Sequence, residues 1–331
     1  MIWILWHRRI GDLNQMQDLA RAMGVPFVIK KLQFYKPHYA PLARLHPQSD
    51  KLQGPWPEYI FCAEAMTSVI ARRLKHQSEG KIKTVCLARP SGDARNFDLI
   101  LTTAQYRLAK LPNVIELMLP LTSAKANLQN SEAKAVTVLI GASSPPEKLD
   151  QGVALEMCKK LMEFANKKNS AFRVVTSPRT QIEVTKTFTD HLEMPHEVFD
   201  WHKNSNRVYQ ASLDAAELII VTSDSVSMIA DALVAGKPVQ IYKLPRSTSA
   251  LLRLVEWLNQ LWPQNFMFTS GFIEPPTDRH LLIEKLIAAG HVIWFGDAEK
   301  KQTPFDPQKD FDLALAAIKR LGLQHSKHSR G

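Results

Sequence analysis

The chain has 331 residues, of which 45% are hydrophobic, and it carries a formal net charge of +10. This composition is typical of a globular protein long enough for two domains with their own cores. No apolar run reaches the roughly 20 residues that cross a membrane, and the N-terminal MIWILWHRRI is charged too early for a signal peptide. We therefore expect a cytoplasmic protein.

The first half of the sequence predicts a parallel α/β domain over residues 1–125. Apolar runs that predict strands occur at MIWILW, VPFVIKKL, YIFCAE, KTVCLAR, FDLILTT and NVIELML. Amphipathic patterns that predict helices follow two of them, at NQMQDLARAMG and AMTSVIARRLKHQ. Short strands joined in this way by helices indicate a parallel sheet covered on both faces.

The same pattern starts again after a polar segment at residues 123–134, which we interpret as a linker. Strands are predicted at VTVLIGA, FRVVTS, HEVFDW, ELIIVT and GKPVQIY, with a long helix at GVALEMCKKLMEFANKK. A second domain is therefore expected over residues 135–305. The fold class predicted for the whole chain is α/β, with two Rossmann-like doubly wound domains that face a central cleft.

The turn that follows ELIIVT is unusually rich in hydroxyl groups. Thr222, Ser223, Ser225 and Ser227 surround Asp224 at the end of a strand and the start of a helix. Ligands bind beyond the carboxyl ends of parallel strands, and a helix N-terminus attracts anions. Helix capping is the alternative, but four hydroxyls exceed what a cap needs. The turn therefore indicates a phosphate or diphosphate site, with Asp224 expected to cap the helix.

Several segments resemble one protein family. SLDAAELIIVTSDSVSMIADALVAGKPVQIY resembles the signature of the plant "elongated mitochondria" fission proteins and of bacterial proteins classed with glycosyltransferases. VTVLIGASS, RVVTSPRT, FDLILTTAQYRLAKLPNVIELML and GDLNQMQDLARAMG resemble further family segments in the same order. The resemblance is strongest over residues 135–245 and weaker over residues 1–120. It implies the GT-B fold, in which a final helix, here residues 306–322, crosses back to the first domain. The polar composition of residues 323–331 separately predicts a disordered basic tail.

In this fold the second domain would bind a nucleotide-sugar donor. The resemblance gives Asp231 the role of the acid that binds ribose, although a solvated helical carboxylate is the competing interpretation. Gly141 would let the backbone approach the ligand, and Arg179 would contact the diphosphate, unless they are a tight turn and a surface charge. The donor-binding candidates are Gly141, Ser143, Ser144, Thr176, Ser177, Arg179, Thr222, Ser223, Ser225, Ser227 and Asp231.

The first domain would bind the acceptor and supply a catalytic base. Asp12 is the preferred base and His7 the second candidate, whereas capping of the next helix is the alternative role for Asp12. Gly11 is expected to permit a turn, and Glu64 could be an ordinary first-turn charge of its helix. The acceptor-side candidates are Gly11, Asn14, Gln15, Glu64 and Thr67.

No cofactor or metal is expected. The sequence lacks metal-ligand spacing, a P-loop and a serine-nucleophile elbow, and Cys62, Cys86 and Cys158 are interpreted as buried thiols. The function predicted is metal-independent transfer of a sugar from a nucleotide-sugar to a cell-envelope acceptor, lipopolysaccharide-like or lipid-linked. A non-catalytic binding protein with the same fold and a nucleotide-sugar epimerase are the alternatives.

The positive charge is concentrated in the first domain. Residues 1–130 contain 18 Lys and Arg against 9 Asp and Glu, whereas residues 131–331 contain 24 against 23. An anionic glycan or lipid-linked acceptor and the inner face of the cytoplasmic membrane are the expected partners; no nucleic-acid motif is present. The segment expected to touch the membrane interleaves Lys30, Lys31, Lys36 and Arg44 with Phe34, Tyr35 and Tyr39. Packing of these aromatic residues into the core is the competing interpretation.

Overall fold

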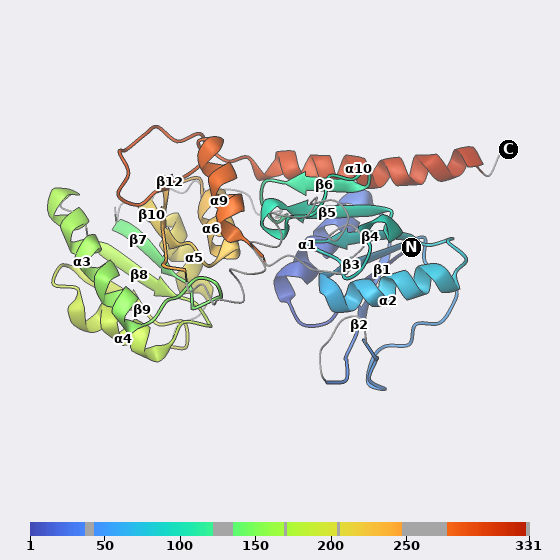
Figure 1. Cartoon of the computed structure of the whole chain (residues 1–331), viewed down its shortest axis with the longest axis horizontal. Coiled ribbons are helices and arrows are strands. Elements are labelled where there is room, and N and C mark those ends of the chain that lie inside the picture. Colours follow the sequence, from blue (N-terminus) through green and yellow to red (C-terminus); the bar gives the residue numbers. More distant parts are fainter. Residues whose placement is uncertain (37–42, 122–134, 169–170, 204–205, 247–276, 329–331) are drawn as a thin grey trace, which may run out of the picture. The chain divides into compact units, whose positions relative to one another are not determined.

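The computed structural model describes residues 1–36, 43–121, 135–168, 171–203, 206–246 and 277–328 (Figure 1). The chain divides into two compact units, each with one six-stranded sheet. The first unit contains β1 to β6 and the C-terminal helix α10, and the second contains β7 to β12 with the helices between them. The linker expected at residues 123–134 lies outside the described residues.

The sheet of the first unit is parallel throughout, in the order β2-β1-β3-β4-β5-β6. Its core strands are fully buried because both faces are covered by helices. Helices α1 and α10 pack on one face and α2 on the other (Figure 1). The elements are β1 (Ile2–Trp6), α1 (Ile10–Met23), β2 (Phe27–Lys31), β3 (Tyr59–Ala63), α2 (Glu64–Gln77), β4 (Lys83–Leu87), β5 (Leu99–Thr103), the 3₁₀ turn η3 (Ala104–Tyr106), β6 (Val114–Leu117) and α10 (Pro307–His328).

The sheet of the second unit is also parallel, in the order β12-β11-β10-β7-β8-β9. Helices α3 and α4 share one core with the strands. The elements are β7 (Ala135–Ile140), α3 (Gln151–Lys168), β8 (Phe172–Thr176), α4 (Ile182–His191), β9 (His196–Phe199), α5 (Asn206–Asp214), β10 (Ala216–Thr222), α6 (Val226–Val234), β11 (Val239–Tyr242), α9 (Arg279–Ala288) and β12 (Ile293–Trp294). The prediction of two Rossmann-like doubly wound domains is confirmed.

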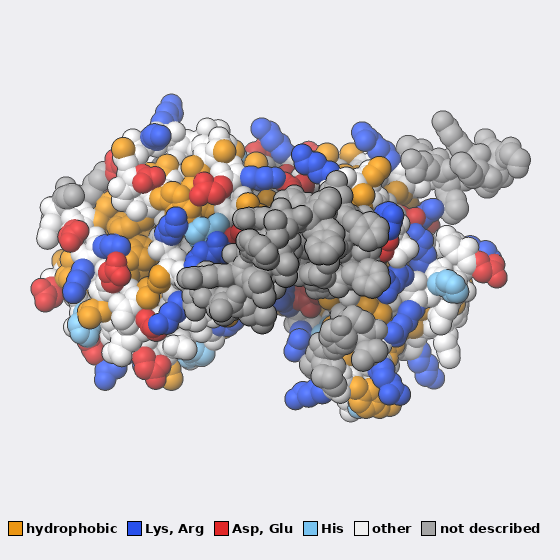
Figure 2. All heavy atoms as spheres, in the orientation of Figure 1, with side chains coloured by type: hydrophobic (Ala, Val, Ile, Leu, Met, Phe, Trp, Pro, Cys, Tyr) orange, Lys and Arg blue, Asp and Glu red, His pale blue; other side chains and the backbone are white. Residues whose placement is uncertain are grey.

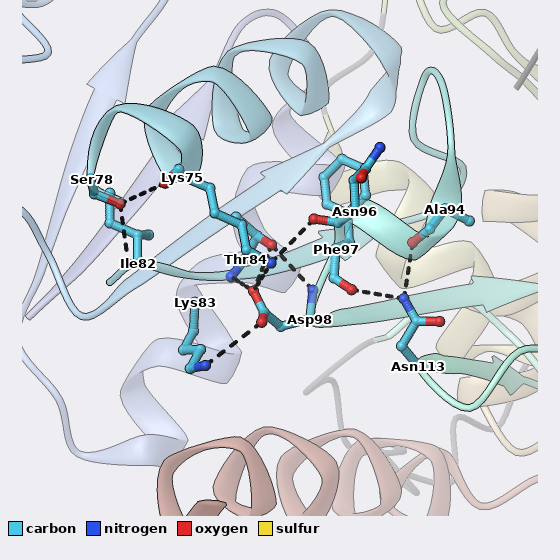
Figure 3. Close-up of polar contacts among 10 residues, drawn as sticks. All are labelled: Lys75, Ser78, Ile82, Lys83, Thr84, Ala94, Asn96, Phe97, Asp98 and Asn113. Carbon is cyan, nitrogen blue, oxygen red and sulfur yellow. Dashed lines mark hydrogen bonds and ion pairs between the residues drawn. The ribbon is translucent and has the colours of Figure 1, made fainter. Parts of the chain in front are cut away.

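A polar cluster joins α2 to the amino ends of β4 and β5 (Figure 3). Asp98 Oδ2 accepts hydrogen bonds from Lys75 Nζ at 2.8 Å, Thr84 N at 2.8 Å and Thr84 Oγ1 at 2.9 Å. Asn113 donates to the carbonyls of Ala94 and Phe97 at 2.9 and 2.8 Å. This cluster fixes the end of the sheet opposite to the one where ligands bind in such folds.

Two local expectations were wrong. Helix α1 begins at Ile10, so Gly11 lies inside the helix and forms no turn. Its neighbours Leu13 and Met16 are buried against the sheet, and that packing extends the helix toward β1. Helix α10 runs to His328, so most of the expected disordered tail is helical, because QHSKH contains no residue that breaks a helix.

Two further properties concern the whole of the described chain. The three cysteines are buried and free, as the sequence indicated. Among the residues that the structure describes, no helix combines the length and hydropathy that crossing a membrane requires.

Candidate functional site

The loops after β7, β8 and β10 of the second unit meet at the carboxyl edge of its sheet. Gly141 N donates to Thr222 Oγ1 at 2.8 Å, which joins the loop after β7 to the last residue of β10. Ser177 Oγ donates to the Gly141 carbonyl at 3.3 Å, and Thr180 Oγ1 donates to the same carbonyl at 2.6 Å. The three segments from which the donor-binding candidates were drawn are therefore adjacent.

Asp224 connects two of these loops. Its Oδ2 accepts a hydrogen bond from Ala142 N at 2.7 Å, and a Cβ on Gly141 would overlap its carboxylate. Gly141 is therefore required because the Asp224 carboxylate approaches the backbone closely. The sequence had suggested that the group approaching Gly141 would be a ligand. Burial raises the pKa of Asp224, although the bond from Ala142 N lowers it. The cap expected of Asp224 is wrong, because Ser225 is the N-cap residue of α6 and no side chain caps that helix.

Several candidate hydroxyls hold the loops together. Ser223 Oγ accepts from Leu244 N at 3.1 Å, and Thr176 Oγ1 accepts from Trp201 N at 3.0 Å. Ser143 Oγ donates to the carbonyl of Leu149 at 2.8 Å and accepts from its N–H at 2.8 Å. These bonds account for the hydroxyls of Thr176, Ser143 and Ser223 without a ligand.

The hydroxyls of Ser225 and Ser227 differ from the others. They form a hydrogen bond with each other at 3.3 Å at the start of α6, and Ser225 makes no side-chain capping bond to the helix. The first-turn N–H groups of a helix have no intrahelical acceptor and carry a partial positive charge. Arg179 is exposed and donates from Nη1 to Ser144 Oγ at 3.0 Å. This end of α6, with its two hydroxyls, is suited to an anion.

Two further contacts at this edge were missed by sequence reasoning. Tyr209 Oη donates to Asp231 Oδ2 at 2.9 Å, so the carboxylate proposed for ribose already has a partner. Arg279 Nη1 binds the fully buried carboxylate of Glu147 at 2.6 Å and also donates to the Ser144 carbonyl at 3.3 Å. Arg279 thus fixes the loop after β7 from a position far along the chain, which no local sequence pattern indicates.

In the first unit, a small cavity at the carboxyl edge of the sheet brings together four candidates. Its lining includes His7, Asp12, Glu64 and Thr67, together with Arg9. Arg9 Nε lies 2.5 Å from Glu64 Oε1, and His7 Nδ1 lies 2.9 Å from the Leu32 carbonyl. Asp12 does not cap α1, whose N-cap residue is Arg9.

The remaining acceptor-side candidates lie outside this lining. Gln15 Oε1 accepts a hydrogen bond from Leu121 N at 3.1 Å, which gives it a structural role. Asn14 is exposed on α1, and Gly11 is a helical residue. Of the candidates in the first unit, those that line the cavity are therefore His7, Asp12, Glu64 and Thr67.

Asp12 is the titratable group of this cavity whose pKa is shifted most clearly. Its pKa is raised from 3.8 to about 6: burial contributes most, the negative charge of Glu64 and a hydrogen bond between the two carboxyls also raise it, and the charge of Arg9 lowers it. A carboxylate with a pKa near 6 is ionised at neutral pH and basic enough to accept a proton from a hydroxyl. The arrangement can therefore serve general-base chemistry.

Backbone strain is concentrated along the same edge. Glu64 follows β3 with φ of 68°, Ala88 follows β4 with φ of 66°, and Arg107 follows η3 with φ of 53°. Such left-handed conformations of residues other than glycine cost about 1–3 kcal/mol each and are frequent at functional sites. Thr67 Oγ1 bonds to both backbone groups of Ala63 and so secures the turn at Glu64.

Tyr106 lies within the electrostatic reach of the carboxylate pair. Burial raises its pKa, as do the negative charges of Asp12 and Glu64, whereas the positive charges of Arg9 and Arg89 lower it. Arg89 Nη1 donates to the Tyr106 carbonyl at 3.4 Å. Sequence reasoning missed Arg9, Arg89 and Tyr106, because only the folded sheet brings the ends of β1, β4 and β5 together.

The two edges differ in the polar groups that they present. Within the described part of the chain, no three His, Cys, Asp or Glu side chains are grouped so that they could hold a metal ion. Hydroxyls, helix N–H groups and guanidinium groups predominate at the edge of the second unit, and a carboxylate pair predominates in the first.

Comparisons with known proteins identify relatives and neighbours. The profile of the family described as Mitochondrial fission ELM1 matches residues 10–267, more than half of the chain. Uncharacterized protein RP120 of Rickettsia prowazekii (strain Madrid E) is 23% identical over 303 residues, which cover 75% of this chain and 84% of the relative.

Solved structures similar to this chain include glycosyltransferases and epimerases. MurG of Acinetobacter baumannii has 10% identity, a TM-score of 0.45 and coverage of 96% of this chain and 90% of its own. The UDP-GlcNAc 2-epimerase of Methanocaldococcus jannaschii has 10% identity, a TM-score of 0.48 and coverage of 96% and 99%. These likenesses concern the arrangement of the chain and carry no argument about substrate.

Proposed function

The chain belongs to the Mitochondrial fission ELM1 family, and we propose that it is a glycosyltransferase that moves a sugar from a nucleotide-sugar donor to an acceptor hydroxyl. The observation that carries the proposal is the pair of hydroxyls of Ser225 and Ser227 at the start of α6, 3.3 Å apart and not used for capping. A diphosphate would accept hydrogen bonds from these hydroxyls and from the helix N–H groups. Arg179 would add a charge-assisted bond.

Asp12 is the proposed base for the acceptor hydroxyl. Its pKa of about 6 keeps it ionised at neutral pH. The excess of 18 Lys and Arg over 9 Asp and Glu in residues 1–130 supports an anionic acceptor, such as a lipopolysaccharide-like or lipid-linked glycan at the inner face of the cytoplasmic membrane. No step in this scheme needs a metal or cofactor.

The test of the donor site is a binding panel with UDP-, GDP-, ADP- and CMP-linked sugars, measured by thermal shift and calorimetry. Replacing Ser225 and Ser227 with Ala should weaken binding of the preferred nucleotide by about 1–3 kcal/mol, because two donors to a charged group are removed. Thr189→Ala, which removes an exposed hydroxyl from α4, is the matched control. Unchanged affinity of the double variant for every nucleotide would refute the proposal.

A non-catalytic binding protein is the second candidate. Its support is that Thr176, Ser143 and Ser223 are used inside the protein, which leaves fewer groups for a ligand than the sequence indicated. Sugar turnover with an acceptor extracted from the cell envelope separates the two candidates. A sugar product formed without any acceptor would instead identify an epimerase.

A further inference from the structure

The second unit contains a cavity that is separate from the loops described above. Its volume is about 550 Å³, within the range of small-molecule sites. It is lined by Glu217 and Leu218 near the start of β10 and by Pro238 and Gln240 near the start of β11. The proposed donor loops follow the opposite ends of these strands, so a ligand in this cavity would not occupy the donor site.

One wall of the cavity is held in place by hydrogen bonds. The segment 299–305 forms this wall. The Gln302 side chain accepts from Val239 N at 2.8 Å and donates to the Val239 carbonyl at 3.0 Å, as a neighbouring strand would. Thr303 N donates to the Gly290 carbonyl at 2.8 Å, and its own carbonyl lies 2.9 Å from His291 Nδ1. These hydrogen bonds fix the wall of the cavity to the rest of the unit.

Gln240 is the unusual residue of the lining. It lies in the buried strand β11 between Val239 and Ile241 and is only 4% exposed. Its Oε1 is buried and has no hydrogen-bond partner among the residues that the structure describes. An unsatisfied buried acceptor costs about 1–3 kcal/mol, and such groups in native proteins call for an explanation. A ligand with an O–H or N–H group would supply the missing donor.

The rest of the lining combines apolar walls with basic side chains. Phe164, Leu218 and Ile293 are among the apolar residues, and Phe305 packs edge-on against His291 with ring centres 5.3 Å apart. In the space-filling view, hydrophobic side chains are exposed over the part of this unit that carries α3 (Figure 2). The charged lining residues are Lys237, Lys300 and Lys301 against Glu217 and Glu299. Apolar walls with a net positive charge favour a ligand that has an apolar body and an anionic group.

We propose that this cavity binds a small amphipathic anion that carries a hydrogen-bond donor. The apolar body contacts Phe164 and Leu218, the donor reaches Gln240 Oε1, and the anionic group is attracted to Lys300 and Lys301. The inference goes beyond the proposed glycosyl transfer, because it assigns a second ligand to the other edge of the same sheet.

The probe for this site is 1-anilinonaphthalene-8-sulfonate, which combines aromatic rings, an N–H donor and a sulfonate. Its fluorescence with the full chain should increase saturably with one site per chain. Gln240→Leu should weaken the binding about tenfold, because one hydrogen bond to a buried acceptor is lost. Thr303→Trp, at an exposed lining residue, should block it without disturbing the core. Lys300→Gln with Lys301→Gln should weaken it and reduce its dependence on salt.

Competition experiments separate the contributions of the ligand's hydroxyl group and of its carboxylate to binding. The expected order of displacement is 10-hydroxydecanoate, then decanoate, then 1-decanol, and the difference between the first two should vanish in Gln240→Leu. The same variant should be as stable as the wild-type chain or more stable, because an unsatisfied polar group is removed.

Matched controls make the outcome decisive. Lys159→Gln with Lys186→Gln removes two exposed lysines of the same unit outside the cavity and should leave probe binding unchanged. Probe binding that survives Thr303→Trp, or that falls equally in both lysine pairs, would overturn the proposal. Ser225→Ala with Ser227→Ala should not affect the probe, so failure of this site and failure of the donor site are distinguishable.

Discussion

At the scale of single residues, the buried carboxyl of Asp12 couples proton binding to stability. The pKa of Asp12 is raised from 3.8 to about 6, chiefly by burial. Between pH 4 and 6 the folded chain therefore holds a proton that the unfolded chain has released, and this stabilisation is lost as the pH rises. Compared with Asp12→Asn, the wild-type chain should lose about 1–3 kcal/mol of unfolding free energy between pH 4 and 7.

Denaturant unfolding at several pH values measures this difference. Asp18→Asn, on the same helix but outside the cavity, should keep the pH dependence of the wild type. In the glycosyl transfer proposed above, the rate should also rise with pH through about 6 as the base ionises, and Asp12→Asn should abolish most of the activity. Parallel stability curves for wild type and Asp12→Asn would contradict the raised pKa.

Gly141 is a residue whose replacement should disturb the donor loops. A methyl group there would overlap the carboxylate of Asp224, which bonds to Ala142 N at 2.7 Å. We expect Gly141→Ala to lower the free energy of unfolding by about 1–3 kcal/mol, since the loop has to move away from a buried side chain. Nucleotide affinity should fall as well. Urea denaturation and calorimetric titration provide the two measurements.

Gly11→Ala is the matched control for that substitution. Nothing lies within 4 Å of a Cβ at Gly11, and the residue is helical, so the change should be neutral or stabilise the chain by up to about 1 kcal/mol. A second test combines Gly141→Ala with Asp224→Ala. If the overlap is the cause, the double variant should be less destabilised than the sum of the two single variants.

At the scale of elements, the Asp98 cluster is expected to anchor α2 on the sheet. Burial raises the pKa of Asp98, but the bonds from Lys75 and Thr84 outweigh burial, and its pKa is lowered below 3.8. The resulting stabilisation is complete above pH 4 and is lost as the pH falls through the lowered pKa. At pH 7, Asp98→Asn should cost about 1–3 kcal/mol, because charge-assisted bonds to Lys75 are lost.

Denaturation of wild type and variant at pH 7 and near pH 3 tests this anchor. The cost of Asp98→Asn should shrink at the lower pH, where the wild-type carboxylate also begins to gain a proton. Lys81→Gln removes an exposed ion pair with Glu79 from the same region and should cost less than about 0.5 kcal/mol. An Asp98→Asn variant as stable as Lys81→Gln at pH 7 would show that the cluster does not anchor the helix.

The strands were predictable from the sequence, whereas the ends of two helices were not. Runs such as YIFCA and AVTVLI are buried on both faces of a parallel sheet, and such strands appear as continuous apolar segments. The start of α1 was missed because Arg8, Arg9 and Gly11 suggest a turn. Tertiary packing of Leu13 and Met16 overrides that local preference.

The candidate site was predictable at the level of loops but not of individual groups. The loops that contain Gly141, Ser177 and Thr222 could be identified because each follows a predicted strand. In the structure these three loops are adjacent. Which hydroxyls remain available depends on contacts between segments far apart in sequence, such as Leu244 N with Ser223 Oγ. Tertiary hydrogen bonds of this kind leave no trace in the local sequence pattern.

At the scale of the whole molecule, the uneven charge distribution predicts how the chain meets a membrane surface. Residues 1–130 carry the excess of Lys and Arg, and Figure 2 shows such side chains around the part of the first unit that holds β2. Phe34 is buried in the core, which agrees with the alternative that the aromatic residues of this segment pack inside the domain. Lys30 Nζ lies 4.7 Å from the centre of the Trp3 ring. Tyr35 remains 48% exposed, whereas Tyr39 lies outside the described residues.

We therefore expect Lys31, Lys36 and Arg44, all exposed, to attach the first unit reversibly to anionic lipid. Each basic side chain near such a surface contributes about 1 kcal/mol, and salt screens the attraction. Co-sedimentation with anionic vesicles should exceed that with neutral vesicles at low salt and decline as salt is added. Replacing all three residues with Gln should abolish the difference, whereas replacing Lys159, Lys186 and Lys203 of the second unit should not. Equal loss in both triple variants would mean that net charge alone, and not this surface, governs the attachment.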